Sequence, residues 1–256
     1  MKLKLTIFLI VAGLLAVNVF GQKTDAKPDV KAPAPPPALP AVKDIIDKYV
    51  QAIGGRAAIE EIQSRYMKGT VTLSPMGVNG TVEAYAAAPD KSYQKLTLAG
   101  LGEFIEGFDG TTAWSVNPLQ GNRDKTGDEL TQTKLTANFY REINLDKLYP
   151  KMEVKGVEKV GDRDAYVVVA TPAGLDPQTF YFDKESGLLV REDATMISPQ
   201  GKMAVKTFSD DFRAVDGVKM PFKIRAVMPQ FEIQTTLTEI KNKVKFDNAI
   251  FTKPKE

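Results

Sequence analysis

The chain of 256 residues contains no cysteine and no histidine. Without cysteine no disulfide can support the fold, so its stability must come from buried surface. Without histidine the chain lacks the usual general base near neutral pH, the commonest zinc ligand and the physiological pH switch. Catalysis by a serine–histidine pair is therefore excluded. We also expect ligand binding to change little between about pH 6 and 8, where no unperturbed side chain titrates.

The chain also lacks an excess of charge of either sign. The chain has 34 basic and 32 acidic residues, and loss of Lys2 and Lys4 with an N-terminal signal would leave 32 of each. A nearly neutral chain has little electrostatic attraction for nucleic acid or for an anionic membrane. We therefore predict no nucleic-acid partner.

The N-terminus has the pattern of a secretory signal. Two lysines precede an apolar run over residues 5–20, and Val19-Phe20-Gly21 supplies the cleavage positions. The alternative is an uncleaved anchor, but the run is shorter than the ~20 residues of a spanning helix. We predict a signal peptide over 1–21 and export to the periplasm. Residues 22–40, rich in alanine and proline, favour a linker over a proline-rich docking motif.

Helical periodicity begins directly after residue 40. Apolar residues recur three and four positions apart and predict an amphipathic helix over 41–53, ended by Gly54-Gly55. A short second helix is indicated over 57–62. A third helix, with a mixed apolar stripe, is predicted over 128–142.

From Tyr66 onward the apolar period changes to two, which predicts strands. Turn signals such as Asp109-Gly110 and Asp216-Gly217 separate them and indicate an antiparallel meander of about twelve strands. A sheet of this size curls, because the twist of its strands accumulates. We therefore predict an α+β fold over 41–256, with the helices over 41–53 and 128–142 on the concave face. Volume that they leave unfilled would be a cavity.

The order of these motifs resembles the LolA-like outer-membrane lipoprotein carriers and lipoprotein-sorting proteins. The resemblance is carried by Asp44–Gly55, Phe108–Trp114, Tyr181–Leu189, Asp211–Pro221 and Asp247–Phe251. It implies an unclosed half-barrel whose helical lid covers an apolar cavity for acyl chains. It further implies a non-catalytic carrier of a lipid or lipoprotein acyl chain, with membrane-bound donor and acceptor proteins as partners. Because the family includes envelope-stress sensors, a sensor that signals by protein contact is the alternative.

Aromatic residues on the strands could line such a cavity, and the chain has one tryptophan. A packed core is the competing interpretation for each of these side chains. If Trp114 lines the cavity, apolar ligands should change its fluorescence. The predicted ligand-binding set combines strand aromatics with two residues of the first helix: Trp114, Phe104, Phe108, Phe180, Phe182, Val50 and Ile53.

Carboxylates could instead support a hydrolase, which is a third hypothesis. Asp183 and Asp216 occupy positions where turns favour aspartate, so turn chemistry already explains them. Asp210 and Asp211 are adjacent and would face opposite sides of a strand, so they could not share a proton. No calcium-loop, zinc-ligand or dinucleotide-loop spacing occurs. We predict no catalytic residue, no metal and no cofactor.

Overall fold

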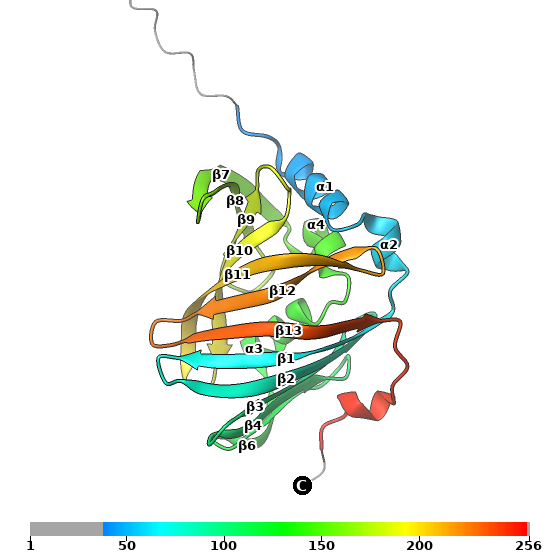
Figure 1. Ribbon diagram of the computed structural model, residues 1–256, viewed down its shortest axis with the longest axis vertical. Coiled ribbons are helices and arrows are strands. Elements are labelled where there is room, and N and C mark those ends of the chain that lie inside the picture. Colours follow the sequence, from blue (N-terminus) through cyan, green and yellow to red (C-terminus); the bar gives the residue numbers. More distant parts are fainter. Residues whose placement is uncertain (1–37, 255–256) are drawn as a thin grey trace, which may run out of the picture. The chain divides into compact units, whose positions relative to one another are not determined.

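The computed structural model describes residues 38–254. The predicted signal peptide lies outside these residues, as does all of the predicted linker except 38–40. The described chain forms a single sheet of thirteen strands, in the order β6-β5-β4-β3-β2-β1-β13-β12-β11-β10-β9-β8-β7, and every pairing is antiparallel (Figure 1). Within the described residues β6 and β7 stay unpaired with each other, so the sheet is not closed. The predicted fold class is confirmed.

The strands are β1 Ser64–Ser74, β2 Val78–Ala87, β3 Lys91–Leu98, β4 Gly102–Phe108, β5 Ala113–Asn117, β6 Gly121–Lys125, β7 Lys151–Val160, β8 Arg163–Thr171, β9 Gln178–Asp183, β10 Leu189–Ser198, β11 Gly201–Val215, β12 Val218–Val227 and β13 Glu232–Asn242. The helices are α1 Val42–Ala52, α2 Arg56–Glu60, α3 Gly127–Thr136 and α4 Leu145–Leu148, with the 3-10 helices η1 Arg141–Ile143 and η2 Asn248–Phe251. Consecutive strands pair as a meander, apart from β13 beside β1 and the step from β6 to the opposite edge at β7.

The segment that joins β6 to β7 carries α3, η1 and α4, and we call it the helical cap (residues 127–148). It lies on the same face of the sheet as α1. Tyr49 of α1 packs against Phe182 with ring centroids 5.3 Å apart, and Tyr149 at the end of the cap packs against Phe180 at 5.2 Å. Phe180 and Phe182 alternate on β9 and therefore share a face. Figure 1 shows α3 behind the central strands and α4 near α1 and α2.

The single helix predicted over 128–142 is wrong in its second half. The structure ends α3 at Thr136 and continues with η1 and α4. The side chain of Asn138 competes with the backbone hydrogen bonds of a continued helix, since its Oδ1 accepts the N–H of Tyr140 at 3.1 Å. The N–H of Phe139 donates to the carbonyl of Pro89 at 2.9 Å. A contact with a distant turn thus breaks the helix.

The hairpin between β11 and β12 forms at the predicted Asp216-Gly217 turn, where both residues have positive φ. It anchors the end of α1, because the N–H of Lys219 donates to the carbonyl of Ile53 at 2.8 Å. A Cβ on Gly54 would lie 2.3 Å from the carbonyl oxygen of Gly217. The backbones of the two residues are therefore too close for any side chain on residue 54. The glycine after α1 thus ends the helix and also allows it to dock on the sheet.

Asp183 is buried at the end of β9 and holds the turn that follows. Its Oδ1 accepts the N–H and the hydroxyl of Ser186 at 2.6 and 2.7 Å, and the N–H of Glu185 at 3.1 Å. Burial raises the pKa of Asp183, but the hydrogen bonds from Ser186 and Glu185 outweigh it and leave the pKa below its ordinary value. The turn role predicted for this residue is the one that the structure shows.

We expect Asp183→Asn to lower the free energy of unfolding at pH 7 by about 1–2 kcal/mol, because charged hydrogen bonds become neutral ones. The folded pKa lies below the unfolded value of about 3.9, so the wild-type advantage is complete above that pH. This stability difference should fade as the pH falls through the folded pKa. Urea unfolding of the wild type and of Asp183→Asn at pH 7 and pH 3 measures the difference, with Glu185→Gln as control. A pH-independent difference would contradict this assignment.

Candidate functional site

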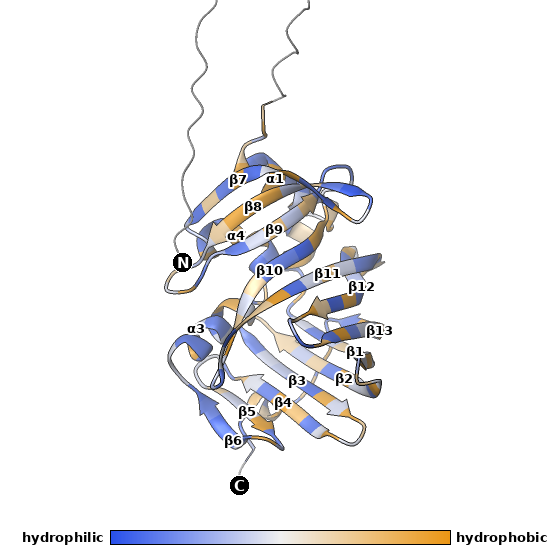
Figure 2. Cartoon of the chain, turned by 90° about the vertical axis from the view of Figure 1, so that its left-hand side faces the viewer, coloured by the Kyte–Doolittle hydropathy of each residue, from blue (hydrophilic) through white to orange (hydrophobic). Residues whose placement is uncertain are grey.

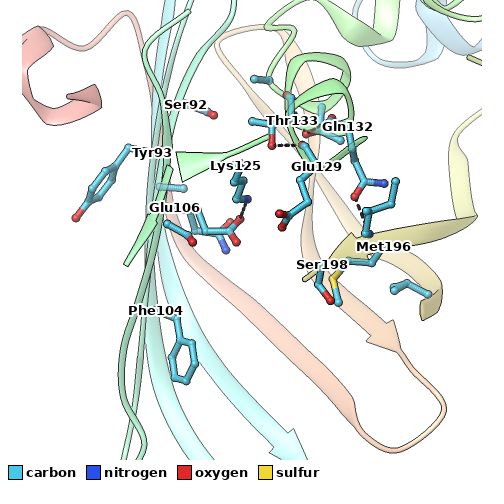
Figure 3. Close-up of a pocket in the computed structure, with 18 of the residues that line it drawn as sticks. Ser92, Tyr93, Phe104, Glu106, Lys125, Glu129, Gln132, Thr133, Met196 and Ser198 are labelled. Carbon is cyan, nitrogen blue, oxygen red and sulfur yellow. Dashed lines mark hydrogen bonds and ion pairs between the residues drawn. The ribbon is translucent and has the colours of Figure 1, made fainter. Parts of the chain in front are cut away.

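A cavity of about 760 Å³ lies against the concave face of the sheet. It is bounded by strands β2 to β6 on one side, by β10 and β11 on the other, and by α3. Its volume falls in the range of small-molecule sites, about 300–1,000 Å³. Figure 2 shows α3, β5 and β6 facing β10 across this region, and Figure 3 shows side chains that line it.

One wall of the cavity is apolar. Met67 of β1 and Ala84 of β2 are cross-strand partners, and Val205 of β11 and Met196 of β10 lie on the cavity as well. Phe104 belongs to this wall and also packs against a buried apolar cluster. That cluster consists of Val71, Leu73, Val82, Leu98, Phe222, Leu237 and Ile240. These side chains give an alkyl chain apolar surface to contact on the cavity lining.

The opposite wall, on β4 to β6 and α3, is polar. Arg123 donates to both oxygens of Glu129, each at 2.9 Å. Lys125 forms an ion pair with Glu106 at 2.9 Å, and Figure 3 shows the two side chains meeting in the cavity. The hydroxyl of Ser115 is buried and has no hydrogen-bond partner among the described residues. The cavity is therefore amphipathic.

Arg141 of the helical cap connects the cap to β10. Its guanidinium donates to Glu192 at 2.7 and 3.2 Å and to the hydroxyl of Tyr149 at 2.8 Å. Tyr149 in turn donates to Gln178 at 2.7 Å. Burial lowers the pKa of Arg141, but the carboxylate of Glu192 and the Tyr149 hydroxyl more than reverse that effect and raise it above the ordinary value. The guanidinium therefore stays charged.

Arg141 and Glu192 also separate the main cavity from a second one. The second cavity has a volume of about 180 Å³ and lies between α1, η1 and the strands β10 to β12. Both residues line both cavities.

The seven predicted ligand-binding residues lie in different parts of the structure, some in cavities and others in buried clusters. Phe104 lines the main cavity and Ile53 lines the second. The core beneath the helices contains Val50, Phe180 and Phe182. Phe108 is buried with Ala113 and Ala137 in a small cluster at α3. Their binding of a ligand stays a prediction, and Phe104 is the one that contacts the main cavity.

Trp114 lies on the other face of the sheet. It is 0% exposed, and its Nε1–H donates to the carbonyl of Phe251 at 3.0 Å. A Cβ on the cross-strand partner Gly107 would come within 2.3 Å of the indole ring. Figure 3 shows Tyr93, whose ring centroid is 6.2 Å from that of Trp114, pointing away from the cavity. The C-terminal segment thus covers Trp114, while Ser115 faces the cavity.

Sequence reasoning did not find the charged residues of the cavity. Residues 121–125 contain no apolar side chain, so the period of two that reveals strands was absent. Charge alternation was the available signal, since Arg123 and Lys125 face the cavity while Asp124 pairs with Lys253 on the other side. Arg141 carried no local signal, because its partner Glu192 is 51 residues away.

Two further observations concern membrane-spanning helices and metal-ligand clusters among the described residues. None of their helices combines the length and apolar character needed to cross a membrane. Across residues 38–254 no three histidine, cysteine, aspartate or glutamate side chains gather as a metal site would require. The charged groups of the cavity instead pair with one another.

No protein-family model matches the sequence, and no curated protein matches it either. Solved structures do resemble it. A LolA superfamily protein from Nitrosomonas europaea aligns with a TM-score of 0.56 at 14% identity, over 84% of this chain and 99% of that one. A DUF1329 family protein from Desulfovibrio piger gives 0.54 at 16% identity, over 82% and 97%. An outer-membrane lipoprotein-sorting protein domain from Vibrio parahaemolyticus gives 0.50 at 10%, over 76% and 92%. The chain has a LolA-like fold.

Proposed function

We propose that the protein is an exported, non-catalytic carrier that holds the acyl chain of a lipid or lipoprotein in the main cavity. The observation that supports this proposal is a cavity of about 760 Å³ with one apolar wall, inside a LolA-like fold. Each methylene group that leaves water for such a wall contributes about 0.8 kcal/mol. An alkyl chain of moderate length would therefore bind without any chemical step.

The predicted signal peptide and the lipoprotein-sorting neighbour both support a place in the cell envelope. A carrier there would receive its cargo from one membrane-bound protein and deliver it to another. The proposed domain organisation is a signal peptide over 1–21, a linker over 22–40 and the binding domain over 41–256.

Entry and release of an acyl chain would require the helical cap to move. Arg141 and Glu192 join the cap to β10 at the border between the two cavities. Breaking this pair would free the cap on that side and enlarge the apolar volume that a chain can occupy. We propose this step as the transition between loaded and empty states.

Ala84 offers a direct test of binding in the main cavity. Titration of the purified protein with monododecanoylglycerol, a neutral single-chain probe, should show saturable binding by calorimetry below its aggregation concentration. We expect Ala84→Arg to weaken it by about tenfold or more, because the new side chain occupies and charges the apolar wall. Thr81→Arg is the matched control, since Thr81 lies on the same strand but faces away and is exposed.

The thermal midpoints of both variants should stay within a few degrees of the wild type, because neither position is fully buried. Absence of saturable binding by the wild type would refute the carrier proposal. Equal weakening by Ala84→Arg and Thr81→Arg would show that the probe binds outside this cavity.

A further inference from the structure

The polar wall of the main cavity contains a compact group of side chains that the binding of an alkyl chain does not need. Glu106, Ser115 and Arg123 are cross-strand neighbours on β4, β5 and β6. Directly opposed residues of this kind have Cβ atoms about 4.5–5.5 Å apart. Lys125 lies two positions from Arg123 on the same face of β6 and also lines the cavity. We call these four residues the Ser115 site.

Ser115 is the unexplained member of this site. Its residue is 2% exposed, and its hydroxyl has no hydrogen-bond partner among the described residues although it lines the cavity. Buried polar groups almost always find a partner, so an exception needs a physical reason. An alanine here would avoid the unpaired hydroxyl and keep the strand. The hydroxyl is therefore positioned to bond to something that enters the cavity.

Lys125 has an ion-pair partner that can be exchanged. Its side chain is only 11% exposed, whereas that of Glu106 is 58% exposed, and the two are 2.9 Å apart. A desolvated ammonium must keep an anionic partner, but an exposed carboxylate can leave for water at little cost. Arg123 is different, because Glu129 holds it with two hydrogen bonds and both side chains are largely buried. Lys125 is thus the cation that can accept a new anion.

We infer that the ligand of the cavity is a single-chain anionic amphiphile. Its carboxylate or phosphate oxygens would replace Glu106 beside Lys125 and accept a hydrogen bond from Ser115, while its alkyl chain lies along Met67, Ala84 and Phe104. The inference rests on the proposed function, because it assigns the head group of the ligand that the apolar wall binds. Charge-assisted hydrogen bonds of this kind are stronger than neutral ones.

The test compares head groups on one alkyl chain at pH 8, by calorimetry below the aggregation concentration of each probe. Dodecanoate should bind about tenfold more tightly than dodecyltrimethylammonium, with neutral monododecanoylglycerol between them. Acetate carries the head group without the chain and should show no saturable binding. Acetate binding as tight as that of dodecanoate would replace the amphiphile with a free small anion and overturn the inference.

Variants separate this head-group site from the apolar wall. Lys125→Met should weaken dodecanoate binding by about tenfold and change monododecanoylglycerol binding by less than about threefold. Glu106→Gln should strengthen dodecanoate binding, because it removes the competing carboxylate. Lys95→Met is the matched control, since Lys95 pairs with Glu103 away from the cavity and should leave every affinity unchanged.

Ser115→Ala separates a role of the hydroxyl in ligand binding from a role in stabilising the fold. It should weaken dodecanoate binding several-fold while the thermal midpoint stays the same or rises, because the variant removes an unpaired buried hydroxyl. If Lys125→Met fails to fold, the dodecanoate affinity of Ser115→Ala still tests whether the head group binds at the Ser115 site.

If the three dodecyl probes bind equally and Ser115→Ala changes none of them, the head-group inference is wrong and the carrier proposal stands. If none of the three binds, both fail.

Discussion

Arg141→Met should lower the free energy of unfolding by about 3–5 kcal/mol, because it leaves the carboxylate of Glu192 without its cation in a largely desolvated place. The same change removes the hydrogen bonds of Arg141 to Tyr149 and the stacking of its guanidinium over Phe180, whose ring centroid is 5.5 Å away. Urea unfolding followed by far-UV circular dichroism measures the loss. We expect it to be among the largest of any single charged residue in the described chain.

Arg163→Met is the matched control, since Arg163 forms an exposed ion pair with Asp210 and exposed pairs contribute roughly 0–1 kcal/mol. The double variant Arg141→Met, Glu192→Leu should recover part of the stability, because it removes the unpaired carboxylate as well. Equal effects of Arg141→Met and Arg163→Met would mean that the pair does not hold the helical cap on the sheet.

Phe251→Ala should have a comparable effect, about 3–5 kcal/mol, because the ring of Phe251 is fully buried and its loss leaves a cavity. The indole of Trp114 would lose its cover on the outer face of the sheet and become exposed to water. We therefore expect the fluorescence maximum of the variant to shift to longer wavelength. As the single tryptophan of the chain, Trp114 makes that signal attributable to one position.

Leu119→Ala serves as control, because the side chain of Leu119 is highly exposed in the turn before β6. The structure also changes an expectation drawn from the sequence. Trp114 faces away from the main cavity, so ligands that bind there should leave its emission unchanged. A wild-type emission maximum typical of exposed indole, or no shift in Phe251→Ala, would contradict the assigned packing of the C-terminal segment.

Local chemistry determined a large part of this fold. The turn at Asp216-Gly217 follows from two residues that tolerate positive φ. The turn after β9 follows from Asp183, whose side-chain oxygen accepts a backbone N–H of the turn. The stripe of α1 follows from apolar residues spaced at the helical period. Each of these signals acts within a few residues, so it is complete in the sequence. The order of such signals also matched the LolA-like fold that the solved structures show.

Tertiary structure alone decided which face of each strand becomes the inside. A period of two separates Trp114 from Ser115, but it does not say which of them faces the concave side. That choice depends on the direction in which thirteen strands curl and on what covers each face. The C-terminal segment covers Trp114, so Ser115 faces the cavity. Likewise Arg141 meets Glu192 only because the cap crosses the sheet, and no local pattern encodes a contact over 51 residues.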